Sequence, residues 1–289
     1  MAENKEKDAI TGVETTGHEW DGIKELNNPL PRWWLYVLYA SIVWSIGYWI
    51  VMPAWPTFTG YTQGVIGHSQ REIVAENVAA AQAAQSTLRD AILERDLEAI
   101  LQDAELLEFA LAGGRAAFGD NCAPCHGSGA EGAPGYPNLN DDVWLWGGGL
   151  EDILTTITYG IRSDHDETRS NEMPAFLAGG ILERQEVSDV VAQVLNFSGR
   201  AEDPEAAARG AEVYLDNCAA CHGDDGLGEQ ALGAPNLADS IWLFGGERAD
   251  IMATVSNGRG GVMPHWQGRL DPVTIKQLVV HVHSLGGGE

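Results

Sequence analysis

The 289-residue sequence contains few cysteines, few methionines and few basic residues. Its four cysteines are Cys122, Cys125, Cys218 and Cys221. They form two close pairs, so no cysteine is left for a structural disulfide if both pairs hold a cofactor. Cysteine usage therefore does not by itself indicate the redox compartment.

Basic residues are outnumbered by acidic ones, 17 to 42, which gives a formal net charge of −25. This charge argues against nucleic acid as a partner and favours a basic protein surface. The first 32 residues also lack an apolar stretch and carry charges of both signs. A cleavable signal peptide is therefore not expected.

One uncharged run interrupts this polar sequence, from Trp33 to Met52. As a helix it would span roughly 30 Å, the thickness of a hydrocarbon core, with aromatic residues near both ends. A buried helix of a soluble protein is the alternative, but the uncharged stretch continues past Pro53. Four basic residues precede the run and the next one is Arg71, which predicts an N-terminus on the inside and the rest of the chain outside.

The second half of the sequence is built on an internal repeat. The stretch DNCAPCHG at 120–127 returns as DNCAACHG at 216–223, PNL at 137–139 returns at 235–237, and Met173-Pro174 returns as Met263-Pro264. Each copy closes with a segment of helical spacing, at 187–197 and 275–285. The repeat predicts two domains derived from one ancestral unit.

Two thiols and one imidazole within five residues permit a zinc site, a redox disulfide or a covalently held haem. Zinc requires four ligands, and the two pairs belong to separate repeats. A thioredoxin-like pair requires a βαβ pattern that the repeats lack. Haem attachment explains every residue of the motif. We therefore predict two covalently bound haem c groups, held by Cys122, Cys125 and His126 in one domain and by Cys218, Cys221 and His222 in the other.

A sixth ligand for each iron is expected from Met173 and Met263, which lie in equivalent loops before the closing helices. The thioether is a soft ligand that raises the reduction potential. Met252 has no counterpart in the first repeat and is interpreted as packing. Two haems with both axial positions filled would carry electrons and bind no substrate. Equal repeats permit each methionine to bind the iron of its own domain or that of the other domain.

The N-terminal stretch HEWDGIKELNNPLPRWW at 18–34, followed by IGYW at 46–49 and PAWP at 53–56, resembles the CcoP (FixP) subunits of cbb3-type cytochrome c oxidases. The likeness covers essentially the whole chain. It implies an electron-transfer subunit that is not itself catalytic. Its partners would be a haem–copper subunit that reduces oxygen and pumps protons, a monohaem c subunit, and a soluble or membrane-bound cytochrome c donor. It carries over the same eight haem-binding residues. Exchange of the methionines between the domains is compatible with the resemblance, and the sequence leaves local and crossed ligation open.

The predicted architecture is mostly α. It comprises a cytoplasmic tail (1–32), a transmembrane anchor (33–54), a periplasmic linker with helices that act as a spacer (55–108), and two tandem cytochrome c-type domains (109–200 and 201–289). The chain would cross the bacterial inner membrane once, with the haem domains in the periplasm. A membrane-anchored dihaem peroxidase and a freestanding dihaem carrier are the alternatives. The roles of the insertion at 162–172 and of the helical segment at 68–111 are left open.

Overall fold

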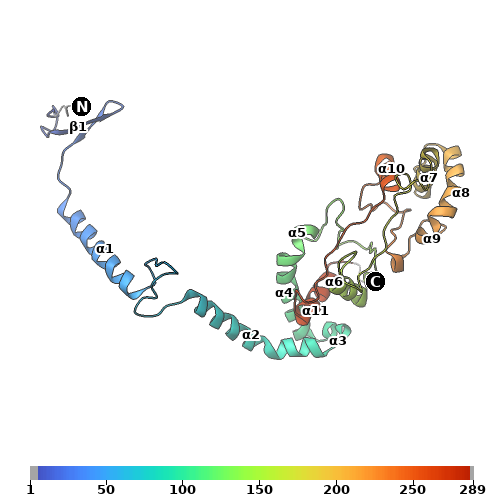
Figure 1. Cartoon of the computed structure of the whole chain (residues 1–289), viewed down its shortest axis with the longest axis horizontal. Helices are drawn as coiled ribbons and strands as arrows, with labels where there is room; N and C mark the ends of the chain where they lie inside the picture. The colour runs from blue at the N-terminus through green and yellow to red at the C-terminus, as the bar shows by residue number, and fades with distance from the viewer. Residues whose placement is uncertain (1–5, 287–289) are drawn as a thin grey trace. The chain divides into compact units, whose positions relative to one another are not determined.

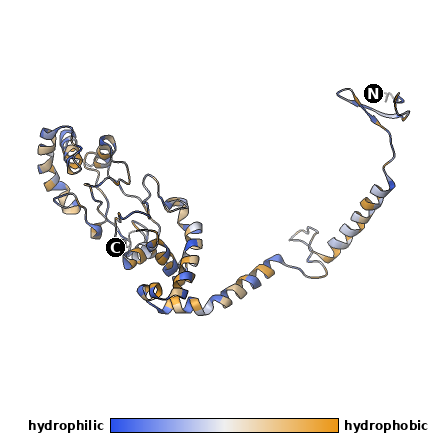
Figure 2. Cartoon of the chain, turned by 180° about the vertical axis from the view of Figure 1, so that it is seen from behind, coloured by the Kyte–Doolittle hydropathy of each residue, from blue (hydrophilic) through white to orange (hydrophobic). Residues whose placement is uncertain are grey.

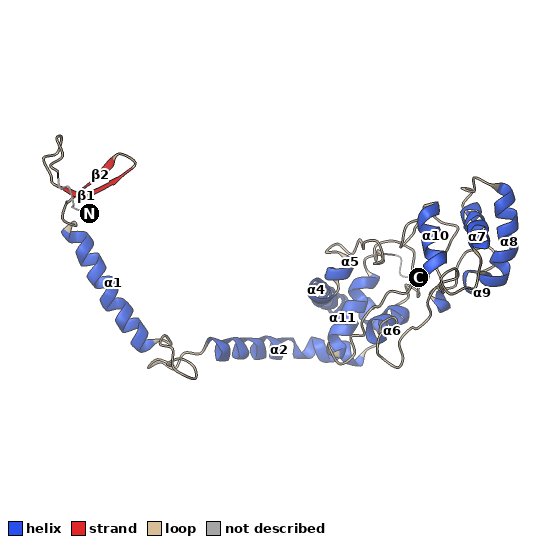
Figure 3. Cartoon of the chain, turned by 45° about the horizontal axis from the view of Figure 1, so that its top comes forward, coloured by secondary structure: helices blue, strands red, loops and turns tan. Residues whose placement is uncertain are grey.

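The computed structural model describes residues 6–286, so residues 1–5 of the predicted tail and 287–289 of the second repeat lie outside the described part. The fold is mostly α-helical, as predicted (Figure 1; Figure 3). Its elements are β1 (Thr15–Trp20), β2 (Ile23–Leu26), α1 (Arg32–Val51), α2 (Gln70–Glu94), α3 (Leu97–Gln102), α4 (Ala104–Asn121), α5 (Ala123–His126), α6 (Leu150–Tyr159), α7 (Arg184–Phe197), α8 (Pro204–Asn217), α9 (Ala219–His222), the 3-10 turn η1 (Gln230–Leu232), α10 (Arg248–Asn257) and α11 (Pro272–His283). The chain forms two compact units, Met1–Ala83 and Ala84–Glu289.

The first unit contains a β-hairpin that the sequence analysis did not predict. Strands β1 and β2 pair antiparallel, with Trp20 opposite Ile23. Asp21 and Gly22 join them with φ angles of 50° and 83°. Two consecutive positive φ angles are what a type I′ turn requires, and Asp-Gly is a preferred pair for it. This dipeptide was the sequence signal for the hairpin.

Helix α1 coincides with the predicted transmembrane segment. It begins after Pro31, ends at Val51 just before Pro53, and carries no charge beyond Arg32 (Figure 2). None of its residues is buried, and it is the one helix in the described part that is long and apolar enough to cross a bilayer. A helix satisfies its own backbone hydrogen bonds, which a bilayer requires. Helix α1 therefore fits the role of a membrane anchor.

The end of the predicted spacer lies in the hydrophobic core of the second unit. Ile92, Leu97 and Ile100, from the end of α2 and from α3, are at most 1% exposed. The Lys276 ammonium of α11 donates to the carbonyl of Ile92 at 3.1 Å and to that of Leu93 at 3.0 Å. A cation at these free carbonyls stabilises the end of α2. The part of the expected spacer that follows Ala84 thus packs with the helices of the repeats.

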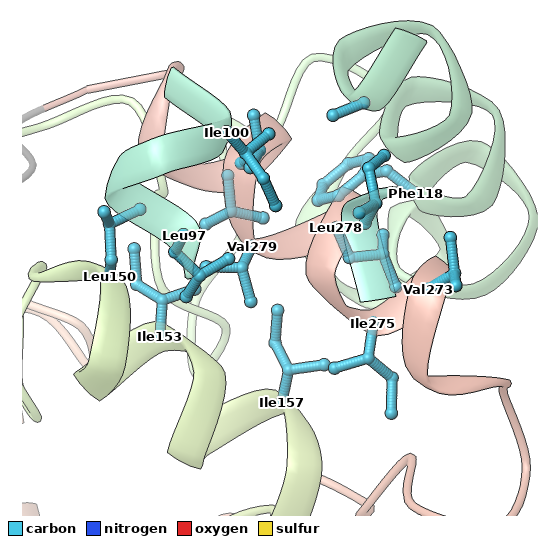
Figure 4. Packing of buried hydrophobic residues seen from close by; sticks show 14 of the residues in the cluster. Leu97, Ile100, Phe118, Leu150, Ile153, Ile157, Val273, Ile275, Leu278 and Val279 are labelled. Carbon is cyan, nitrogen blue, oxygen red and sulfur yellow. The ribbon is translucent and has the colours of Figure 1, made fainter. Parts of the chain in front are cut away.

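The second unit has two hydrophobic cores, and each combines helices from both repeats. The first core lies between α3, α4, α6 and α11, and Figure 4 shows how its apolar side chains meet. The second lies between α7, α8 and α10. Helix α11 of the second repeat packs on α4 of the first, and α7 of the first repeat packs on α8 of the second. We call α3–α6 with α11 the first body, and α7–α10 the second body. Each body therefore contains helices from both sides of the predicted domain boundary between residues 200 and 201.

Repeated glycines allow these helices to approach closely. A Cβ atom added at Gly114 in α4 would overlap the carbonyl oxygen of Gln277 in α11. A Cβ atom added at Gly210 in α8 would overlap the carbonyl oxygen of Asp189 in α7. The glycine that recurs before each Cys–His motif therefore sets the distance to the closing helix.

Candidate haem sites

Each Cys–His motif forms one tight helical turn at the end of a longer helix. Helix α5 follows α4 directly, and the backbone N–H groups of Cys125 and His126 donate to the Cys122 carbonyl at 3.1 and 2.9 Å. Helix α9 repeats this geometry, with distances of 3.1 and 3.0 Å to the Cys218 carbonyl. One turn thus holds two sulfurs and an imidazole close together in both copies, as the motif predicts.

Both histidines are held by a backbone carbonyl that the sequence analysis did not single out. His126 Nδ1 lies 3.1 Å from the Pro137 carbonyl oxygen, and His222 Nδ1 lies 3.0 Å from that of Pro235. When Nδ1 carries the proton and donates it to this carbonyl, Nε2 keeps its lone pair for a metal. The repeated Pro-Asn-Leu sequence was visible, but only the fold reveals its contact with the imidazole.

Burial favours the neutral form of both imidazoles and of one thiol in each motif. It lowers the pKa of the His126 and His222 imidazoles, with the hydrogen bond to the proline carbonyl acting in the opposite direction. It raises the pKa of the Cys122 and Cys218 thiols to about 11, helped by the neighbouring cysteine of each pair. At neutral pH these imidazoles are free bases that can bind iron. The two thiols are protonated at neutral pH, and their sulfurs remain available for thioether bonds.

The two candidate methionines lie in the body opposite to their own repeat. Met263 exchanges backbone hydrogen bonds with Ile161 at 2.9 and 3.0 Å and packs on the core of the first body. Met173 exchanges two bonds of 3.0 Å with Arg259 and packs on the core of the second body. The side chain of Met252 contributes to the second core, in agreement with a packing role. The fold thus brings each methionine into the same core cluster as a cysteine of the other repeat, Cys122 or Cys218.

In the described part of the chain, the first body has one buried indole donor without a partner. Trp144 Nε1 is buried and has no hydrogen-bond partner among the described residues. Its ring packs on the same core as Cys122 and Met263. Native proteins rarely leave such a donor unpaired. A haem carries two carboxylates and a large apolar ring, so it could both accept from this indole and pack against the core.

The two bodies meet through loops that connect their helices. The Gly135 N–H donates to the Leu243 carbonyl at 2.8 Å. Asn171, in the insertion at 162–172, donates to the Leu232 carbonyl at 2.7 Å. The two bodies are therefore in direct hydrogen-bonded contact.

Comparisons with known proteins cover the whole chain. Residues 12–59 match the N-terminal domain of cytochrome oxidase-cbb3, FixP; residues 111–198 match cytochrome c; and residues 205–282 match cytochrome c oxidase, cbb3-type, subunit III. The cbb3-type cytochrome c oxidase subunit FixP of Bradyrhizobium sp. (strain ORS 278) is 51% identical over 100% of both chains. FixP of Azorhizobium caulinodans is 53% identical over 98% of this chain and 96% of its own. CcoP of Cereibacter sphaeroides is 52% identical over 95% of both.

Proposed function

Because the chain belongs to the FixP/CcoP family of cbb3-type cytochrome c oxidase subunits, we propose that it binds two haems covalently and passes electrons from a donor cytochrome toward the haem–copper subunit of the oxidase. One observation carries the proposal. The chain holds two Cys–His turns of the same geometry, each with its imidazole oriented by a proline carbonyl and each packed in a core with a methionine.

The packing supports a crossed assignment of ligands. The first haem would be attached to Cys122 and Cys125 and bound by His126 and Met263; the second would be attached to Cys218 and Cys221 and bound by His222 and Met173. When bound, such a haem exchanges one electron between ferric and ferrous iron, and thioether ligation raises its potential. The protein's part is to hold the imidazole in the correct tautomer, present the thioether and exclude water.

The matched methionines favour an electron carrier over a peroxidase. A peroxidase needs one iron with a displaceable or absent sixth ligand. In this chain both methionine loops are tied by paired backbone bonds, to Ile161 and to Arg259. Each body therefore holds a methionine that could fill the sixth position, and the oxygen-reducing site would belong to another chain.

The membrane arrangement follows from α1 and the charges around it. Four basic residues precede this helix, and the next basic residue after it is Arg71. We place the N-terminus in the cytoplasm and the haem domains in the periplasm of a bacterial inner membrane. The haem–copper and monohaem subunits would be the neighbours of the chain in the complex.

Co-purification tests this function. When membranes are solubilised in mild detergent and the chain is captured by an affinity tag, a haem–copper subunit should elute with it. Haem staining after denaturing electrophoresis should show covalent haem, and the double variant Cys122→Ala/Cys125→Ala should keep one haem of two by intact mass. A chain that elutes alone and turns over hydrogen peroxide would replace this function with the peroxidase alternative.

A further inference from the structure

The insertion at 162–172 carries a partly buried arginine, Arg169, whose buried Nε has no hydrogen-bond partner among the described residues. Only two buried side-chain nitrogens in the described part of the chain have no hydrogen-bond partner: Trp144 Nε1 and Arg169 Nε. The Arg169 side chain is only 14% exposed. A guanidinium at this depth is expected to pair all of its donors, because an unpaired buried donor is costly. The Nε–H of Arg169 is therefore available to an acceptor from outside the described residues.

Both unpaired donors are found around the segment 144–152, which comprises the loop before α6 and the start of that helix. The Trp144 pyrrole edge lies against Gly148, and the Asp152 carboxylate lies against Gly147. Arg169 Nη2 donates to the Asp152 carboxylate at 3.1 Å and to its backbone carbonyl at 3.2 Å. The Asp152 side chain is 53% exposed, so water screens much of the charge that it sets against the guanidinium.

Arg169 is also held in place from two other directions. Its backbone N–H donates to the Gly160 carbonyl at 3.2 Å, next to the Ile161–Met263 pair. Its guanidinium lies over the Trp146 ring, 5.2 Å from the centroid. The insertion thus delivers a fixed positive charge to the rim of the first body, beside the loop that carries Met263.

The second body also has an arginine over an aromatic ring and a matching tryptophan, although Arg259 occupies the repeat position of Ile161 and not that of Arg169. There the Arg259 Nε and the tryptophan Nε1 have partners within the protein. Arg259 lies 4.8 Å over Phe244, which is the repeat counterpart of Trp146, and its Nε donates to Thr254 Oγ1 at 3.1 Å. Trp242, the counterpart of Trp144, donates to the Asp239 carbonyl at 3.3 Å. Free donors at this position are therefore specific to the first body.

We propose that Arg169 binds a propionate carboxylate of the first haem through its Nε–H, with Trp144 Nε1 as a second donor to the haem carboxylates. The inference rests on the proposed function. A haem brings two carboxylates to a site of otherwise apolar contacts, and a guanidinium is the side chain best suited to bind them. Arg169 is thus a positioning residue, and its charge favours the ferrous over the ferric state at the first site.

Redox titration of the intact, detergent-solubilised protein tests the proposal. Wild type and Arg169→Met are compared at equal haem content. The first haem is identified as the redox transition that is missing from the titration of Cys122→Ala/Cys125→Ala. In Arg169→Met the ferrous-to-ferric ratio of that haem at a fixed potential should fall roughly tenfold, a shift of ~59 mV for a one-electron couple. The midpoint potential of the second haem should not change, and Arg169→Lys should restore most of the potential that the first haem loses in Arg169→Met.

Arg162→Met is the matched control, because it removes the same charge from the same insertion. The Arg162 Nε and Nη1 groups already donate to the carbonyls of Gly261 and Asn171, both at 2.5 Å. The proposal would be overturned if the midpoint potential of the first haem shifted equally in Arg162→Met, or if it did not shift in Arg169→Met. Either result would leave the two-haem function standing. If Arg169→Met fails to retain haem, Trp144→Phe is measured instead. The midpoint potential of the first haem should again fall, and an unchanged potential would refute the role of these donors. A wild-type chain without covalent haem would instead refute the proposed function.

Discussion

The backbone and the side chain of Met173 and Met263 have separable roles. The backbone of each residue is bonded on both its N–H and its C=O to a residue that follows α6 or α10. Gly160 and Gly258 allow this close approach, because a Cβ atom at either position would overlap a methionine carbonyl. Substitution of the side chain should therefore change the ligand while the loop stays in place.

The crossed assignment makes a prediction that a local assignment does not share. In a Cys122→Ala/Cys125→Ala background, which keeps the second haem alone, Met173→Leu should abolish the near-infrared methionine-to-iron charge-transfer band. Met263→Leu should retain it, because that thioether serves the other body. Leucine has nearly the volume of methionine, so the packing cost should stay below about 1.5 kcal/mol. Met252→Leu is the control and should keep the band. If the band is lost in Met263→Leu and kept in Met173→Leu, each methionine binds the iron of its own repeat.

At the scale of elements, the closing helices depend on one glycine in each body. Gly114 and Gly210 are matched repeat positions, and each contacts the backbone of a closing helix. Interiors are packed as densely as organic crystals, so even one added methyl group must displace a neighbour. At these positions the neighbour is a backbone carbonyl, which cannot rotate away as a side chain can.

Two alanine substitutions in α4 should therefore have opposite effects. Gly114→Ala would push α11 away from α4 and should lower the free energy of unfolding by about 1–3 kcal/mol. Gly119→Ala meets no atom within 4 Å, so the gain in helix propensity should raise that free energy by up to about 1 kcal/mol. Guanidinium unfolding of the haem-loaded protein, followed by circular dichroism, measures both. Equal effects of the two variants would contradict the close packing of α4 on α11.

At the scale of the whole molecule, the acidic surface predicts how a donor is recognised. From Arg71 onward the chain has 13 basic and 35 acidic residues. A basic donor cytochrome would be steered toward such a surface, and the second-order rate of reduction should fall as salt rises above ~0.1 M, where the Debye length is ~10 Å. Stopped-flow reduction at several ionic strengths measures this rate. A rate that is flat or rises with salt would point to an acidic donor, or to a charge that serves solubility alone.

Several features of this molecule followed from local sequence. The membrane helix depends on apolar length, the closing helices α7 and α11 on apolar spacing, and the Cys–His turns on residues within one helical turn. The hairpin at Asp21-Gly22 had an equally local signal that the sequence analysis did not use. The carbonyls of Pro137 and Pro235 and the unpaired donor of Arg169 were beyond prediction, because each depends on contacts between residues that are distant along the chain.

The sequence by itself determined the local spacing of the thiols and the imidazole in each motif, and from that spacing two haem sites are predicted. It did not determine which closing helix and which methionine complete each body. The repeats present the same glycine on α4 and α8 and the same apolar faces on α7 and α11, so either pairing satisfies the pattern. Only the tertiary structure showed that the helices α7 and α11 and the two methionine loops pack against the other repeat. Residues 198–203 form a short link that lets α7 fold back on α8, as short connections between helices favour, and α11 is then left to pack on α4.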